Sequence, residues 1–175
     1  SSAETEIQFA LDLIRYVNSA DESQYTNPYS PHLIEIANSL TYVREQKGLI
    51  NPRLMLQETN LLRETAKFSG DEMIDSTSTG LLERAEAVIS SALKIVDQEG
   101  FNVELRSQLL VELASTLGAR AKSLYSTDPQ SAFQYFEHLR QYLFDARSAS
   151  RANFYPIDVL FWTTQDLVRN DNVPT

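Results

Sequence analysis

The chain has 175 residues, and its 15 basic and 24 acidic residues leave a net charge of −9 at neutral pH. With 42% apolar residues it can bury a hydrophobic core without disulfides, so we expect a single folded domain over residues 1–175. The absence of cysteine excludes a disulfide scaffold, a cysteine nucleophile and zinc sites with cysteine ligands. The negative charge disfavours general nucleic-acid binding, because an acidic surface repels phosphate.

Apolar residues recur every three or four positions along most of the chain, which is the period of an amphipathic helix. Seven such stripes are present, and no segment alternates with the two-residue period of a strand. We therefore predict an all-α chain of seven antiparallel helices. The stripes cover residues 7–17, 33–43, 54–66, 82–96, 105–124, 132–146 and 157–168.

Capping residues indicate where these helices begin and end. Three starts pair an N-cap residue with a proline that suits the first helical position, and two more follow an asparagine: Ser30-Pro31, Asn51-Pro52, Asp128-Pro129, Asn102 and Asn153. Glycine often ends a helix in a left-handed conformation, and the glycines that follow apolar runs are Gly48, Gly70 and Gly100.

The expected helix starts repeat at an even interval. Starts at residues 31, 52, 80, 103, 129 and 155 place alternate helices about 50 residues apart. Because short loops make successive helices antiparallel, we predict stacked helix hairpins in a right-handed solenoid, with a closed helical bundle as the alternative. The polar segment 71–80 is the longest link between helices, and we expect it to be mobile.

Part of the chain resembles a tetratricopeptide repeat (TPR). The resemblance rests on Leu113-Ala114-Ser115-Thr116-Leu117-Gly118, the turn at Asp128-Pro129, Ala132-Phe133-Gln134-Tyr135-Phe136, and Pro156. The turn is longer here, and the repeat interval exceeds the family's value of about 34 residues. The resemblance implies a right-handed solenoid whose inner surface binds a peptide or protein partner. Similar long-helix arrays occur in bacterial multidomain signalling and defence NTPases, so we expect additional domains in a longer parent chain.

The residues typical of catalysis or metal binding are sparse. The five glycines lie apart and form no phosphate-binding loop, and the only histidines are His32 and His138. His32 and Glu35 share a helical face, but a di-iron site needs two such pairs with further carboxylates. We therefore predict no catalytic residue, no metal and no cofactor.

The binding residues that we expect lie on the last two predicted helices. The helix over 132–146 carries an aromatic-polar face and an arginine face, formed by Tyr135, His138 and Tyr142 and by Arg140, Arg147 and Arg151. Arginine offers forked donors to carboxylate or phosphate, and tyrosine gives contact area at low entropic cost. The alternative is that the tyrosines flank the core while the arginines pair with acidic residues.

Trp162 lies on the side of the last predicted helix that faces away from its apolar stripe. It packs as extra core, faces a further helix of a longer chain, or contacts a ligand as a binding anchor.

Together these patterns favour a non-enzymatic protein–protein interaction or scaffold module that holds a partner segment in a helical groove. The alternative is a regulatory sensor domain for a small anionic ligand within a larger enzyme. No stretch approaches the roughly 18 apolar residues that a membrane span requires, and we expect a cytoplasmic location.

Overall fold

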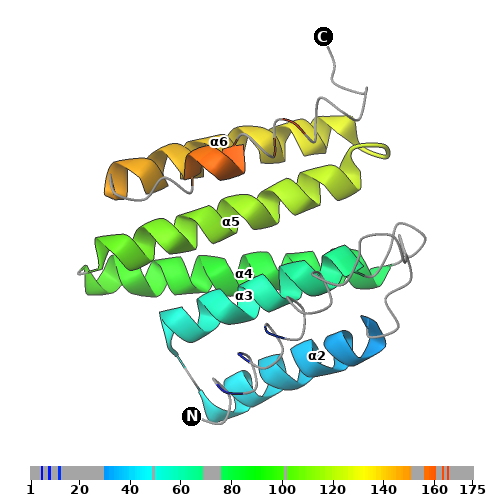
Figure 1. Ribbon diagram of the computed structural model, residues 1–175, viewed down its shortest axis with the longest axis vertical. Coiled ribbons are helices and arrows are strands. Elements are labelled where there is room, and N and C mark those ends of the chain that lie inside the picture. Colours follow the sequence, from blue (N-terminus) through cyan, green and yellow to red (C-terminus); the bar gives the residue numbers. More distant parts are fainter. Residues whose placement is uncertain are drawn as a thin grey trace. The chain divides into compact units, whose positions relative to one another are not determined.

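The computed structural model describes residues 30–48, 50–68, 76–100, 102–150 and 156–160, and the single positions 5, 8, 12, 163 and 165. Within these residues the regular structure is helical and no strand occurs, so the predicted all-α class is confirmed (Figure 1). None of the helices in this part of the chain combines the length and hydrophobicity that a bilayer span requires.

Five helices have defined bounds: Ser30–Lys47 (α2), Pro52–Phe68 (α3), Ser76–Glu99 (α4), Val103–Leu124 (α5) and Pro129–Ala149 (α6). A further helical run covers residues 156–160, so the described part of the chain holds six helical segments where the sequence predicts seven. The first predicted helix, over residues 7–17, lies outside the described residues apart from Gln8 and Asp12, which are helical.

The chain divides into two compact units, Ser1–Val88 and Ile89–Thr175, and the division falls within α4. In the first unit α2 packs on α3, and in the second α5 packs on α6. The single domain over residues 1–175 and the choice between a solenoid and a bundle stay predictions.

The predicted starts of α3, α5 and α6 are confirmed at residues 52, 103 and 129. Each start has a side-chain cap that satisfies a backbone N–H group left free by the first helical turn. The acceptor and donor pairs are Asn51 Oδ1 with the Arg53 N–H at 3.0 Å, Asn102 Oδ1 with the Leu105 N–H at 2.9 Å, and Asp128 Oδ1 with the Ser131 N–H at 3.1 Å.

Two of the three predicted glycine stops are confirmed. Gly48 and Gly100 have φ angles of 57° and 75°, in the left-handed region that L side chains rarely adopt. They end α2 and α4, whereas Gly70 lies outside the described residues.

The start of α4 differs from the prediction, because the helix begins at Ser76 rather than at residue 80. Residues 76–80, which the sequence assigns to the polar link, are therefore helical. Serine and threonine lower helix stability only slightly, and the buried stripe that begins at Leu81 and Leu82 stabilises the helix as a whole. Residues 71–75 lie outside the described residues, so the mobility of the link stays a prediction.

In the second unit α5 is buried on more than one side. It buries eleven residues, against four on α6, and these include Val111 and Ala114 beyond the predicted stripe. The stripe itself is buried from Leu105 to Ala121, and its last residue, Leu124, is half-buried. Neighbours therefore cover α5 on several sides, which a single apolar stripe does not indicate.

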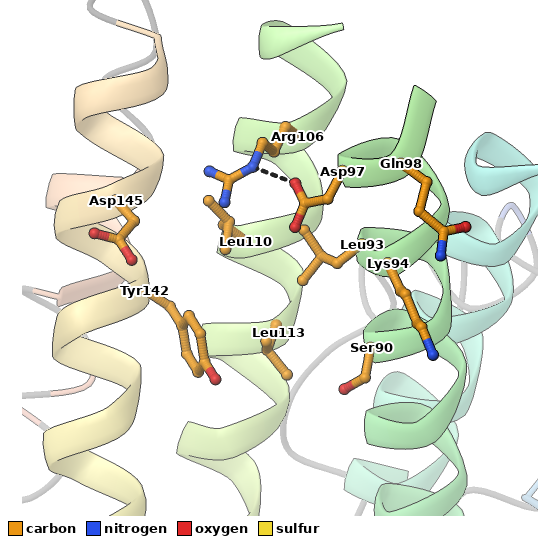
Figure 2. Close-up of a pocket in the computed structure, with 10 residues that line it drawn as sticks. All are labelled: Ser90, Leu93, Lys94, Asp97, Gln98, Arg106, Leu110, Leu113, Tyr142 and Asp145. Atoms are coloured by element: carbon orange, nitrogen blue, oxygen red, sulfur yellow. Dashed lines mark hydrogen bonds and ion pairs between the residues drawn. The ribbon is translucent and has the colours of Figure 1, made fainter. Parts of the chain in front are cut away.

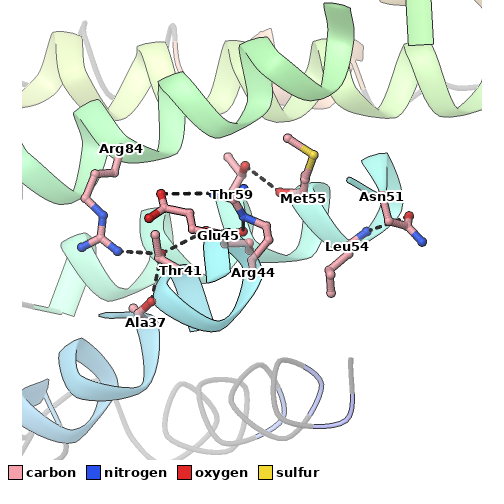
Figure 3. A network of polar contacts seen from close by, with 10 residues as sticks. Ala37, Thr41, Arg44, Glu45, Asn51, Leu54, Met55, Thr59 and Arg84 are labelled. Carbon is pink, nitrogen blue, oxygen red and sulfur yellow. Dashed lines mark hydrogen bonds and ion pairs between the residues drawn. The ribbon is translucent and has the colours of Figure 1, made fainter. Parts of the chain in front are cut away.

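In the first unit the buried carboxylate of Glu58 connects α3 to Thr41 and Arg44 on α2. Figure 3 shows Thr41 and Arg44 beside Arg84 of α4. Glu58 on α3 is only 1% exposed; its Oε1 accepts a hydrogen bond from Thr41 Oγ1 at 3.0 Å, and its Oε2 pairs with Arg44 Nε. Arg84 on α4 donates to Thr41 Oγ1 at 2.7 Å, which extends the network to a third helix. A carboxylate buried this deeply needs such partners, because desolvation of an unpaired charge is costly.

Candidate functional site: a groove along α5

A groove lies along α5 between α4 and α6 in the second unit (Figure 2). Its volume is about 440 Å³, within the size range of ligand-binding clefts. α4 contributes Ser90, Leu93, Lys94, Asp97 and Gln98, α5 contributes Arg106, Leu110 and Leu113, and α6 contributes Tyr142 and Asp145.

Three leucines form the floor of the groove. Leu93 on α4 and Leu110 and Leu113 on α5 are between 3% and 8% exposed, so each is already packed into the core. Tyr142 extends from α6 toward α5 and is half-buried (Figure 2). The groove therefore has an apolar floor and a tyrosine on one wall, and tyrosine offers contact area at low entropic cost.

Charged side chains of both signs border the groove in equal numbers, Lys94 and Arg106 against Asp97 and Asp145. Arg106 Nε donates to Asp97 Oδ1 at 2.7 Å, and these two side chains are 37% and 51% exposed. An exposed pair of this kind adds at most about 1 kcal/mol to stability. Its main effect is to neutralise the charge at one end of the groove.

A cation lies over an aromatic ring further along the α5–α6 pair. The guanidinium carbon of Arg120 is 4.8 Å from the centre of the Tyr135 ring, within the range of a cation–π contact. Arg106, Leu113 and Arg120 are seven residues apart, about two helical turns, so they lie along one face of α5. Sequence reasoning selected Tyr135 but missed Arg106 and Arg120; this seven-residue spacing is the signal that could have identified them.

Two hydrogen bonds hold α6 against α5 beside the groove. Ser107 Oγ donates to the carbonyl oxygen of Ala146 at 2.8 Å, and Ser150 Oγ donates to Glu104 Oε2 at 2.7 Å. Tyr142 lies one helical turn before Ala146 on α6. The two hydrogen bonds therefore help to fix the position of Tyr142 along α5.

The aromatic-polar face predicted on α6 lies toward the groove. Tyr142 lines it, and Tyr135 is half-buried beneath Arg120. His138 falls between the two tyrosines on the same side of the helix and is exposed.

The predicted arginine face lies on the opposite flank of α6. At 100° per residue, Arg140 and Arg147 are about 140–160° around the helix from Tyr142. Arg140 is exposed and Arg147 is half-buried. The tyrosine and arginine faces therefore do not meet in one pocket. Arg151 and Trp162, the two remaining predicted site residues, lie outside the described residues.

The lining of the groove combines hydroxyl, charged and apolar side chains. Among the residues that the structure describes, no three or more histidine or acidic side chains are grouped so that they could hold a metal ion. The hydroxyl groups that line the groove belong to Ser90 and Tyr142, and the described lining supplies no histidine to act as their base. An apolar floor with a charge-balanced rim is suited to binding an amphipathic surface.

The described part of the chain is all-α, and three successive helices, α4, α5 and α6, line its groove. No protein-family model matches the chain, and neither curated proteins nor solved structures give a match. The resemblance to the tetratricopeptide repeat and the expected NTPase parent chain therefore stay predictions.

Proposed function

We propose that this chain is a non-enzymatic interaction module whose groove holds an amphipathic helical segment of a partner protein. The observation that carries the proposal is the groove itself, in which α4, α5 and α6 supply a leucine floor and the Tyr142 wall. A helix laid along α5 would place its residues i, i+3, i+4 and i+7 on that floor, which is a recurrent mode of peptide recognition.

The charges on the rim determine which kind of segment fits. Two cations and two anions give the lining no net charge, so the groove complements a segment with mixed charges beside its apolar stripe. The alternative, a sensor of a small anionic ligand, has less support because Arg106 is already paired with Asp97 at 2.7 Å.

We expect the affinity to be weak. The three floor leucines are at most 8% exposed before any partner binds, so an incoming segment covers little additional apolar surface there. Association must also offset the loss of translational and rotational freedom. A dissociation constant of about 1 µM or higher is expected on these grounds.

Helical peptides selected from a display library on the whole chain test the proposal. Their affinity is then measured by fluorescence anisotropy on the wild type and on Ser90→Arg and Tyr142→Ala, which obstruct and shorten the walls of the groove. Ser90 is exposed on its helix, so the arginine does not disturb the core. Each variant should weaken binding at least about tenfold, equivalent to about 1.4 kcal/mol.

Lys122→Glu is the matched control, because Lys122 is exposed on α5 and lies outside the groove lining. This variant should bind the selected peptides as the wild type does. Amide chemical-shift changes on peptide binding should fall within residues 90–98, 106–113 and 142–145. If no peptide is selected, or if the selected peptides bind both groove variants unchanged, the groove is not the binding site.

A further inference from the structure

The outward side of α6 carries two exposed phenylalanines that the groove does not use. Phe133 and Phe144 are 57% and 58% exposed. They are eleven residues apart, close to three full turns, so they lie on the same side of the helix. Glu137 and Arg140 are also exposed and lie between them, within an arc of about 60°. We call these four residues the α6 stripe.

The spacing of the four residues in the α6 stripe is symmetric about its midpoint. Its members are separated by four, three and four positions, so its midpoint falls between residues 138 and 139. Two copies of α6 that pack antiparallel about this midpoint bring Phe133 of each copy to Phe144 of the other. The same operation brings Glu137 to Arg140 twice. An interface with a two-fold axis requires this kind of self-complementary surface.

We propose that two copies of this chain associate through the α6 stripe as an antiparallel, two-fold symmetric dimer. Each copy supplies two phenylalanine rings and one charge of each sign, so two aromatic contacts and two ion pairs form without any other partner. The chain as a whole carries a charge of −9, but the α6 stripe has no net charge. Two copies can therefore approach each other at the stripe without local charge repulsion.

The dimer is independent of the proposed groove function. Tyr142 lies about 170° around α6 from the centre of the stripe, so pairing through the stripe leaves the groove open in both copies. We expect a contact formed by four residues of each copy to bury less than the roughly 1,000 Å² of a stable specific interface. The dimer is therefore expected to populate with rising concentration rather than to be permanent.

Sedimentation equilibrium of the whole chain tests the dimer, from about 5 to 500 µM in about 0.15 M salt. The weight-average mass should rise from that of one chain toward that of two. Glu137→Arg and Arg140→Glu each place like charges opposite one another, and each should raise the dissociation constant at least about tenfold. Both positions are exposed, so neither change disturbs the core.

Charge exchange makes the test specific. The double variant Glu137→Arg/Arg140→Glu restores opposite charges across the two-fold axis and should associate as the wild type does. The two single variants mixed together should form a heterodimer, because one then presents two cations and the other two anions. Lys122→Glu, an exposed charge reversal on α5, should leave the association unchanged.

Three results would overturn the proposal. The first is a wild-type chain that stays monomeric over the whole concentration range. The second is a dimer that neither single charge reversal weakens, which would place the contact elsewhere on the surface. The third is a double variant whose dimer has a dissociation constant as high as those of the single variants. Glu137 of one copy would then not pair with Arg140 of the other.

Discussion

Ser107 on α5 donates a hydrogen bond to the carbonyl oxygen of Ala146 on α6 at 2.8 Å, and both residues are fully buried. The same carbonyl accepts the backbone N–H of Ser150 at 3.1 Å. The last turn of α6 is thus joined to the first turns of α5 by a bond that crosses 39 positions of the sequence. Because Tyr142 lies one turn away, this bond also positions the wall of the groove.

Ser107→Ala should lower the free energy of unfolding by about 1 kcal/mol, the typical net contribution of one hydrogen bond. The loss is modest because the Ala146 carbonyl keeps the N–H of Ser150 as a partner, so no buried acceptor is left unsatisfied. Urea denaturation followed by circular dichroism measures the change.

Ser115→Ala is the control for this substitution. Ser115 Oγ donates to the carbonyl of Val111, four residues earlier on the same helix, at 2.9 Å. Removing a bond within one helix costs little, and alanine has the higher helix propensity, so a change within about 0.5 kcal/mol is expected. Equal losses in the two variants would show that the contact between helices adds nothing.

Arg44→Leu in the first unit should be far more costly, by about 3 kcal/mol or more, because it leaves the carboxylate of Glu58 buried without its cation. The double variant Arg44→Leu/Glu58→Leu removes the stranded charge and should be more stable than Arg44→Leu alone. Urea unfolding of both variants and of Glu58→Leu completes the double-mutant cycle.

The exposed pair of Arg106 and Asp97 is the matched comparison. Both side chains are more than a third exposed, so Arg106→Leu should change the unfolding free energy by less than about 1 kcal/mol.

One result would contradict the prediction for the buried pair. If the double variant Arg44→Leu/Glu58→Leu were less stable than Arg44→Leu alone, the cost of Arg44→Leu would not come from an unpaired buried charge.

The contrast between the caps and this buried network shows what the sequence could predict. Asn51, Asn102 and Asp128 cap α3, α5 and α6 with donors only two or three residues away, so local pattern was sufficient to locate those starts. Glu58 depends on Thr41 and Arg44, which lie 17 and 14 positions earlier on another helix. No local pattern indicates such a partner.

The same distinction applies to the candidate site. Helical periodicity placed Tyr135 and Tyr142 on one face of α6 and Arg140 on another, and the structure keeps these faces apart. Periodicity within α6 identifies its buried stripe, of which Ala132, Leu139, Leu143 and Ala146 are buried, but not which neighbouring helix covers that stripe. The groove and the contact of Arg120 with Tyr135 arise from packing between helices, so only the structure could reveal them.

Gly118→Ala should stabilise the chain by about 0.5–1 kcal/mol, because glycine in a helix interior is entropically unfavourable. A β-carbon at this position would lie 3.6 Å from Thr163 Cγ2 and 3.7 Å from Leu139 Cδ2, which are ordinary contact distances. Gly118→Leu needs more space than these neighbours leave and should destabilise the chain by about 1–3 kcal/mol. Thermal unfolding measures both changes.

Gly80 provides the control, since it also lies in a helix but a β-carbon there would meet nothing within 4 Å. Gly80→Leu should therefore be neutral or stabilising. If Gly118→Leu were equally well tolerated, the close approach of Thr163 and Leu139 to α5 would be wrong.

Asp128→Asn should make the stability of the chain less sensitive to acid pH. The pKa of Asp128 is lowered, first by the hydrogen bond from the Ser131 hydroxyl and next by that from the Ser131 backbone N–H. A carboxyl group whose folded pKa lies below its unfolded value of 3.8 stabilises the folded state above that value. This stabilisation is lost as the pH falls through the folded pKa.

Asparagine at position 128 separates the charge from the cap, because it caps a helix about as well as aspartate and does not titrate. The melting temperature of the wild type should therefore fall more steeply than that of the variant below about pH 4, and parallel curves from neutral pH to pH 2.5 would contradict the role of the Asp128 charge.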